Sequence, residues 1–219
     1  MTRRQRTRES LRRRRPSVAP RACVLIVCEG LETEPRYFKA LQKKLRLLPV
    51  EIEVVGQGAA PKTVVERAVE LLKGRRHEVK RSRADFNYDH VWCVIDAEQQ
   101  TKNPSLLPAL VQAQDNGINV ALSNPCFEYW FILHFADSGR PLVDARGVIR
   151  ELRKHIPGYE KAQDVFETLW PAVDRAAGRS KASADSHERA GTDRHLRDPS
   201  TEVHELVELL RRTAARPQT

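Results

Sequence analysis

Carboxylates that follow apolar runs are the residues in this sequence whose types and spacing favour chemistry. Glu29 comes directly after the run 23–28. Asp96 and Glu98 come directly after the run 91–95. Because the carboxyl ends of parallel strands meet at one edge of a sheet, we expect these side chains to lie together. Carboxylate oxygens suit Mg²⁺ or Mn²⁺, and a metal held there can stabilise phosphoryl oxygens and activate water for phosphodiester chemistry.

Each of these carboxylates, taken alone, has a simpler interpretation. An acid after a strand often serves as a turn residue or as the N-cap of the next helix. Their coincidence at the ends of two buried strands favours a site, because like charges brought together repel unless a cation or a substrate compensates them.

Glu128 is an additional candidate for an acidic site. It lies in a run, 127–133, that is apolar almost throughout, so its side chain should be buried and should need partners. A structural role is equally open, because Asn124 can cap that helix with Pro125 in its first position, and an acid in the opening turn complements the helix dipole.

Lys62 is a candidate phosphate contact. It stands at an expected helix start, where backbone N–H groups favour anions. The segment does not match a P-loop, since Pro61 occupies the position of the glycine that precedes the lysine. ATP hydrolysis by this chain is therefore not expected.

The elements that must position these residues alternate regularly along the first half of the chain. Short runs rich in β-branched residues predict strands, and apolar residues at helical spacing between them predict helices. This alternation favours a parallel four-stranded sheet with helices on both faces, and the basic stretch 75–83 is interpreted as a surface connection. The predicted strands are 23–28, 52–55, 91–95 and 118–122.

The second half of the chain has no further strand pattern after residue 124. The polar stretch 178–199 has few apolar anchors, so we interpret it as a mobile loop or as a segment ordered by a partner. The predicted organisation is a basic tail and linker (1–20), an α/β domain (21–123) and a helical extension (124–219). Helices are expected near 125–135, 143–154, 160–176 and 201–214.

The positive charge is concentrated at the start of the chain. Residues 1–15 hold eight arginines against the single acid Glu9, so they carry +7 of the net charge of +9. Such a block commonly contacts phosphate backbones or a partner, although a solvated tail is an equal alternative. The arginines are Arg3, Arg4, Arg6, Arg8, Arg12, Arg13, Arg14 and Arg15.

Composition also narrows the compartment. The four cysteines lie in or beside apolar runs without CxxC pairing, which indicates reduced core residues. No apolar run approaches the roughly 20 residues that span a bilayer. We therefore expect a cytoplasmic protein without a membrane contact; an Arg-rich mitochondrial leader is the competing interpretation.

Several separated motifs, in this order, resemble the RloB family of bacterial phage-defence proteins. They are Ile26-Val27-Cys28-Glu29-Gly30 with Thr33-Glu34-Pro35 and Tyr37-Phe38, then Val94-Ile95-Asp96, then Ser123-Asn124-Pro125-Cys126-Phe127-Glu128-Tyr129-Trp130 with His134-Phe135. That family resembles the Toprim superfamily, which includes primases, type IA and type II topoisomerases and nucleases of the overcoming-lysogenisation-defect type. The resemblance implies a Toprim-like fold.

Carried over residue by residue, the resemblance makes Glu29 a general acid or base and gives Asp96 and Glu98 the Mg²⁺. Glu98 stands where the superfamily pattern has a second aspartate. The expected function is a Mg²⁺-dependent nuclease that acts on RNA or DNA in phage defence, with a separate ATPase partner. The alternatives are a non-catalytic module that binds nucleic acid or the ATPase, and nucleotidyl transfer of the primase kind.

Overall fold

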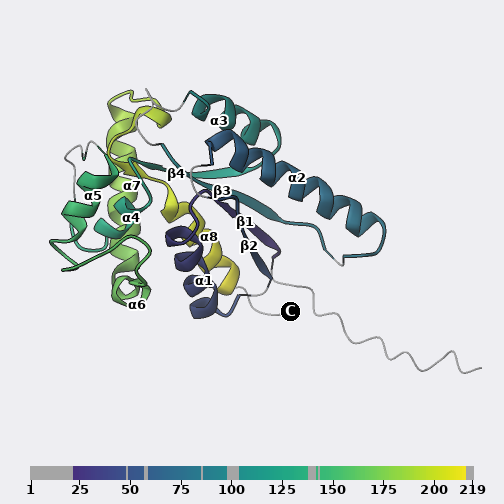
Figure 1. The fold of residues 1–219 in the computed structure, drawn as a ribbon, viewed down its shortest axis with the longest axis horizontal. Helices are drawn as coiled ribbons and strands as arrows, with labels where there is room; N and C mark the ends of the chain where they lie inside the picture. The colour runs from purple at the N-terminus through teal and green to yellow at the C-terminus, as the bar shows by residue number, and fades with distance from the viewer. Residues whose placement is uncertain are drawn as a thin grey trace, which may run out of the picture.

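The protein is an α/β structure with a mixed, mostly parallel sheet of five strands (Figure 1). The computed structural model describes residues 22–47, 49–56, 59–84, 86–97, 104–137, 142 and 144–215.

The sheet is centred on β1 (Val24–Cys28), which lies between β2 (Val50–Val54) and β3 (His90–Asp96). The strand order is β2-β1-β3-β4-β5, and the first four strands are parallel. The expectation of four parallel strands is therefore incomplete, because β5 (Ser200–Thr201) pairs antiparallel with β4 (Asn119–Asn124). The expectation that no strand follows residue 124 is wrong.

Helices cover both faces of the sheet. Alternate residues of a strand point to opposite faces, so Leu25 and Val27 pack under α2 (Pro61–Lys80) and α3 (Leu106–Asp115). Their neighbours in the strand face the other layer, where the core is larger. That layer is built from α1 (Thr33–Leu45), α4 (Glu128–Ile132), α8 (Val203–Ala215) and the helices between α4 and α8.

The helical segment after β4 differs from the expected one. The helix predicted over 160–176 begins only at Phe166 and then continues well past residue 176. The stretch 178–199, expected to be a loop or partner-ordered, is largely helical, because Ala176, Ala177 and Ser180 give it a buried face of small side chains. The elements are α5 (Ala145–Leu152), α6 (Phe166–Leu169), η2 (Trp170–Ala172), α7 (Val173–Arg189) and η3 (Arg194–Leu196).

The basic stretch 75–83 is also more regular than expected. It was interpreted as a connection, but α2 continues to Lys80, which makes the helix 20 residues and about 30 Å long. The helix starts at the carboxyl edge of the sheet and ends at the amino edge, where the chain turns into β3 (Figure 1).

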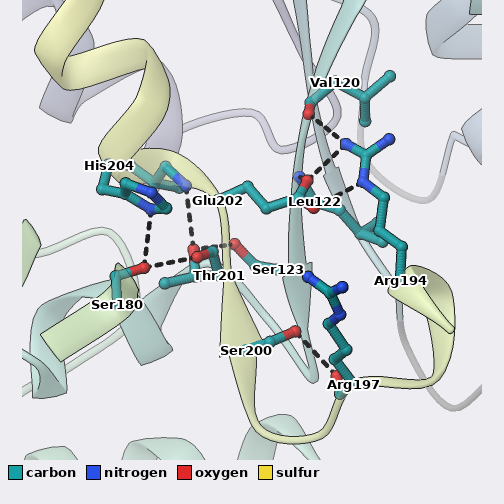
Figure 2. A network of polar contacts seen from close by, with 11 residues as sticks. Val120, Leu122, Ser123, Ser180, Arg194, Arg197, Ser200, Thr201, Glu202 and His204 are labelled. Carbon is teal, nitrogen blue, oxygen red and sulfur yellow. Dashed lines mark hydrogen bonds and ion pairs between the residues drawn. The ribbon is translucent and has the colours of Figure 1, made fainter. Parts of the chain in front are cut away.

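Side chains join β5 to its surroundings and cover the exposed edge of β4 (Figure 2). The hydroxyls of Ser123 and Thr201 lie 2.8 Å apart. Beyond β5, Arg194 donates to the carbonyl of Val120, and the carboxylate of Glu202 accepts the N–H of Leu122. An unpaired strand edge invites association with other chains, and these two side chains satisfy its backbone groups.

The four cysteines are buried and free, as the sequence indicated. Within the described ranges, no helix is long and apolar enough to cross a membrane.

Candidate active site

Glu29 and Asp96 meet at the carboxyl edge of the sheet. The N–H of Glu29 donates to the carbonyl of Val94 at 3.2 Å, which extends the β1–β3 pairing past the end of β1. The carboxylate of Glu29 then accepts the backbone N–H of Asp96, with 3.2 Å between N and Oε2. Two residues expected to converge from adjacent strands are therefore in direct contact.

Glu34 brings an additional carboxylate to the same edge. It lies in the first turn of α1, and its side chain is buried, with 5% exposed. Burial raises the pKa of Glu34, and the nearby Glu128 carboxylate raises it further, whereas backbone N–H groups and Lys161 oppose the shift. A Cβ added at Gly30 would lie 2.1 Å from Glu34 Oε2, so a residue without a side chain is needed there.

Glu128 is buried as the sequence indicated, with 1% of its surface exposed. The hydroxyl of Thr33 donates to Glu128 Oε1 at 3.4 Å and connects α4 to the start of α1. Asn124 does not cap α4, because its side-chain amide donates to the carbonyl of Arg197 instead. The burial of Glu128 therefore depends on α1, which places its carboxylate beside the others.

Asp96 has the most unfavourable surroundings for a charge in this group. Burial raises the pKa of Asp96 well above its usual value, and the carboxylates of Glu34, Glu128 and Glu29 raise it further. Its Oδ1 atom is shielded from solvent and has no hydrogen-bond partner among the described residues. An uncompensated buried carboxylate oxygen is costly, so a cation or a proton at this position would stabilise the site.

Lys161 supplies positive charge from a different part of the chain. It lies between α5 and α6, in a loop that Arg36 of α1 holds by donating to the carbonyl of Ala162. Partial burial lowers the pKa of Lys161, but the charges of Glu128, Asp96, Cys126 and Glu34 outweigh this and raise it overall. The amino group therefore stays protonated and offsets part of the negative charge.

The donors at this edge fit a hard divalent cation in their chemistry. Carboxylate oxygens are the ligands that Mg²⁺ and Mn²⁺ prefer, and Asp96 Oδ1 is available. As the side chains stand in the described ranges, however, no three His, Cys, Asp or Glu residues form a group able to hold a metal. Glu98, the second expected ligand, lies outside the described residues.

The remaining candidate residues are not part of this cluster as described. Lys62 is exposed in the first turn of α2, and its amino group lies 3.8 Å from the carboxylate of Glu66. The eight arginines between Arg3 and Arg15 lie outside the described residues.

A groove of about 950 Å³ begins beside the carboxylates and follows α1. Leu31, two residues after Glu29, lies at one end, and Phe166 forms part of the opposite wall. Three exposed cations of α1, Lys39, Lys43 and Arg46, line the groove and form no ion pair with any described residue. The groove therefore offers positive charge next to a negatively charged site.

Two members of the cluster had no role assigned from the sequence. Glu34 had a usable signal, since an acid in the first turn of the helix after β1 must lie near the carboxyl edge of the sheet. Lys161 had none, because its position depends on how the α5–α6 loop folds back over α1.

The fold and the site define an α/β protein with clustered carboxylates at the carboxyl edge of a mostly parallel sheet. The family model described as RloB-like protein matches residues 24–210. The chain therefore belongs to the RloB-like protein family, and the resemblance drawn from its motifs is confirmed. No curated protein and no solved structure matches the chain.

Proposed function

We propose that this protein is a Toprim-like, metal-dependent nuclease that cleaves RNA or DNA in bacterial phage defence. The observation that carries the proposal is the contact of Glu29 with the backbone of Asp96, beside an Asp96 oxygen that has no partner among the described residues. This arrangement supports an edge that binds a cation and places a carboxylate next to it.

In this proposal, Asp96 and Glu98 hold Mg²⁺ or Mn²⁺, and Glu34 and Glu128 add negative charge around it. A bound metal of this kind stabilises charge on phosphoryl oxygens and lowers the pKa of bound water. The raised pKa values of Asp96 and Glu34 support the proposal, because strongly shifted carboxyl groups clustered at one edge are typical of functional sites.

Glu29 is the proposed general acid or base. Its carboxylate is held by the N–H of Asp96 and is only partly buried, so it can exchange protons with a substrate or with solvent. The hydrogen bond orients Glu29 without neutralising it. The proposed role is to accept a proton from the attacking group or to donate one to the leaving oxygen.

The groove along α1 is the proposed approach for the substrate backbone. Lys39, Lys43 and Arg46 can neutralise phosphates on a strand whose scissile bond lies near Glu29. Lys161 is proposed to stabilise the phosphoryl charge at the cluster itself, where its charge already acts on Asp96 and Glu34.

A separate ATPase partner is proposed from the family resemblance alone. The Arg-rich residues 1–15 and the exposed side of α7 are the proposed contact surfaces. A partner that hydrolyses ATP would restrain the nuclease until infection, since this chain has no P-loop.

A non-catalytic module that binds nucleic acid or the ATPase is the second candidate. The charge of Lys161 favours it, because an internal ammonium group can offset the carboxylates without any metal. In that case, the edge would be a structural remnant of a catalytic site.

One experiment separates the two candidates. The full-length protein is incubated with tRNA, single-stranded DNA and plasmid DNA, with and without Mg²⁺ or Mn²⁺, alone and with the ATPase partner. Metal-dependent cleavage that is lost in Asp96→Asn supports the nuclease. Binding without cleavage under every condition supports the module.

A further inference from the structure

The far end of α2 carries a dense group of exposed cations. The last buried side chain of the helix is Leu72, yet the helix continues to Lys80. Within the described residues, the side chains of five cations beyond Leu72 form no hydrogen bond or ion pair, and Glu78 is the one acid between them. We call this group the α2 basic end: Lys73, Arg76, Lys80, Arg81 and Arg83.

Helix stability does not account for these cations. Positive charge complements the helix dipole only within the last turn, which covers Lys80 but not Lys73 or Arg76. Arg76 and Lys80 are four residues apart, where like charges destabilise a helix by about 0.2 to 0.5 kcal/mol. A helix extension that buries nothing and repels itself suggests an external ligand.

The helix is held firmly where the cations begin. Arg75 is half-buried, and its guanidinium is paired with the carboxylate of Glu51 on β2. It also donates to the hydroxyl of Tyr88 at 3.1 Å and lies 4.7 Å from the centre of that ring. These contacts fix the helix end against the sheet, so the neighbouring cations are presented in a defined arrangement.

The arrangement fits a phosphate backbone. Lys73, Arg76, Lys80 and Arg83 are spaced by three, four and three residues, which places the helical ones on one face. Lys73 and Lys80 are about 10 Å apart along the helix axis. One strand of a duplex carries a phosphate about every 3.4 Å of axis, so this stripe covers about three phosphates.

An acidic protein surface is a poorer fit. Protein interfaces have an apolar core, whereas nucleic-acid interfaces are polar and strongly positive. Among the described residues from 73 to 89, Phe86 is the one exposed large hydrophobic side chain. The surface therefore offers charge with almost no apolar area to bury.

The position of the surface separates it from the carboxylates. The α2 basic end lies at the amino edge of the sheet, about 30 Å of helix from the start of α2 at the carboxyl edge. The same edge receives the start of β1, where the N–H of Cys23 donates to Asp89 at 2.7 Å. Only seven residues separate Arg15, the last of the N-terminal arginines, from Cys23 in the sequence.

We propose that the α2 basic end is a nucleic-acid-binding surface that holds the phosphate backbone at a distance from the carboxylate site. It needs neither metal nor cleavage. It would anchor a part of the nucleic acid that does not react.

The test compares three full-length variants in EDTA. Arg76→Glu/Lys80→Glu/Arg83→Glu reverses the surface, and the corresponding triple Gln variant neutralises it without adding acids. The control, Arg146→Glu/Arg150→Glu/Arg175→Glu, makes the same charge change at exposed arginines of α5 and α7 that have no ion pair with described residues. Fluorescence anisotropy measures binding to duplex DNA and duplex RNA of about 20 base pairs, between about 50 and 200 mM salt.

Removing three phosphate contacts should reduce the slope of log affinity against log salt by about 2.7. At about 0.1 M salt we expect a loss of at least tenfold for the Glu variant, a smaller loss for the Gln variant and little loss for the control. The three side chains are exposed, so melting temperatures should stay close to that of the wild type. If the Glu variant does not fold, the Gln variant decides.

Two outcomes would overturn the proposal. Equal losses in the α2 variant and the control would show that only net charge matters. Unchanged binding in both α2 variants would leave this surface for a protein partner. Either result is independent of the nuclease proposal, because no metal is present.

Discussion

Asp96→Asn should raise stability and abolish cleavage, so the two properties should move in opposite directions. The carboxyl group of Asp96 is surrounded by Glu29, Glu34 and Glu128, and its Oδ1 has no partner among the described residues. Asparagine keeps the shape and removes one negative charge from this group. The same change removes the proposed metal ligand.

The expected gain follows from the cost of a buried polar group without a partner. That cost is about 1 to 3 kcal/mol, and it adds to the repulsion between the carboxylates. For a domain of about 200 residues, 1 kcal/mol corresponds to a melting temperature shift of about 2 to 4 °C. Without metal, Asp96→Asn should therefore melt about 2 to 12 °C above the wild type.

Metal should reverse this order. Mg²⁺ at about 100 times its dissociation constant would stabilise the wild type by about 2.7 kcal/mol, and Asp96→Asn should lose most of that gain. Glu29→Gln should also stop cleavage but keep the response to Mg²⁺, since Glu29 is proposed to move protons. Its side-chain oxygen can still accept the N–H of Asp96.

The assays are thermal melts with and without Mg²⁺ and single-turnover cleavage of the best substrate found. Glu66→Gln, an exposed carboxylate of α2, is the matched control and should behave as the wild type. Cleavage at the wild-type rate by both Asp96→Asn and Glu29→Gln would refute the reasoning and favour the binding module.

Three further predictions concern single residues and the tail. Glu128→Gln retains an acceptor for Thr33, so melting should stay level while cleavage falls at least tenfold; full activity would leave Glu128 a packing role. Gly30→Ala should displace Glu34 and lower both melting temperature and cleavage, whereas Gly74→Ala, with open space around it, should stabilise α2 by up to about 1 kcal/mol. Removing residues 1–15 should lower the salt slope for single-stranded nucleic acid by roughly 3 to 5, and an unchanged slope would assign the tail elsewhere.

The pH prediction, grouped with these, rests on His134. Burial lowers the pKa of His134 to about 4, below its ordinary value of 6.5. The folded state therefore binds fewer protons than the unfolded state, so stability falls as pH drops from about 6.5 toward 4, by about 3 kcal/mol in total. His134→Gln should flatten denaturant-unfolding free energies over this range, and an unchanged pH dependence would contradict the assignment.

The sequence predicted the parts of the site that depend on one strand at a time. Runs of β-branched residues marked β1 and β3, and parallel pairing then required Glu29 and Asp96 to converge. Glu128 was predicted to be buried for a similar reason, since apolar neighbours surround it. These inferences need only local pattern and the geometry of a parallel sheet.

The rest depends on packing between distant segments. Lys161 reaches the carboxylates because Arg36 holds its loop, and no local pattern signals that contact. β5 has two residues, Ser200 and Thr201, too few for an alternating pattern. α7 was missed because its buried face uses alanine and serine, which bury little apolar surface although alanine strongly favours helix.

The pairing of β4 with β5 has a consequence for the order of events during synthesis. Ser123 and Thr201 are 78 residues apart, and α8, which directly follows β5, packs against α1. A ribosome releases Glu29 and Asp96 long before this closing layer exists, and pairings across such separations form slowly. Until α8 is complete, α1 lacks part of its core, so Glu34 and the loop of Lys161 are not held in place. An interrupted chain would therefore carry the carboxylates without an assembled site, which confines the proposed activity to finished molecules.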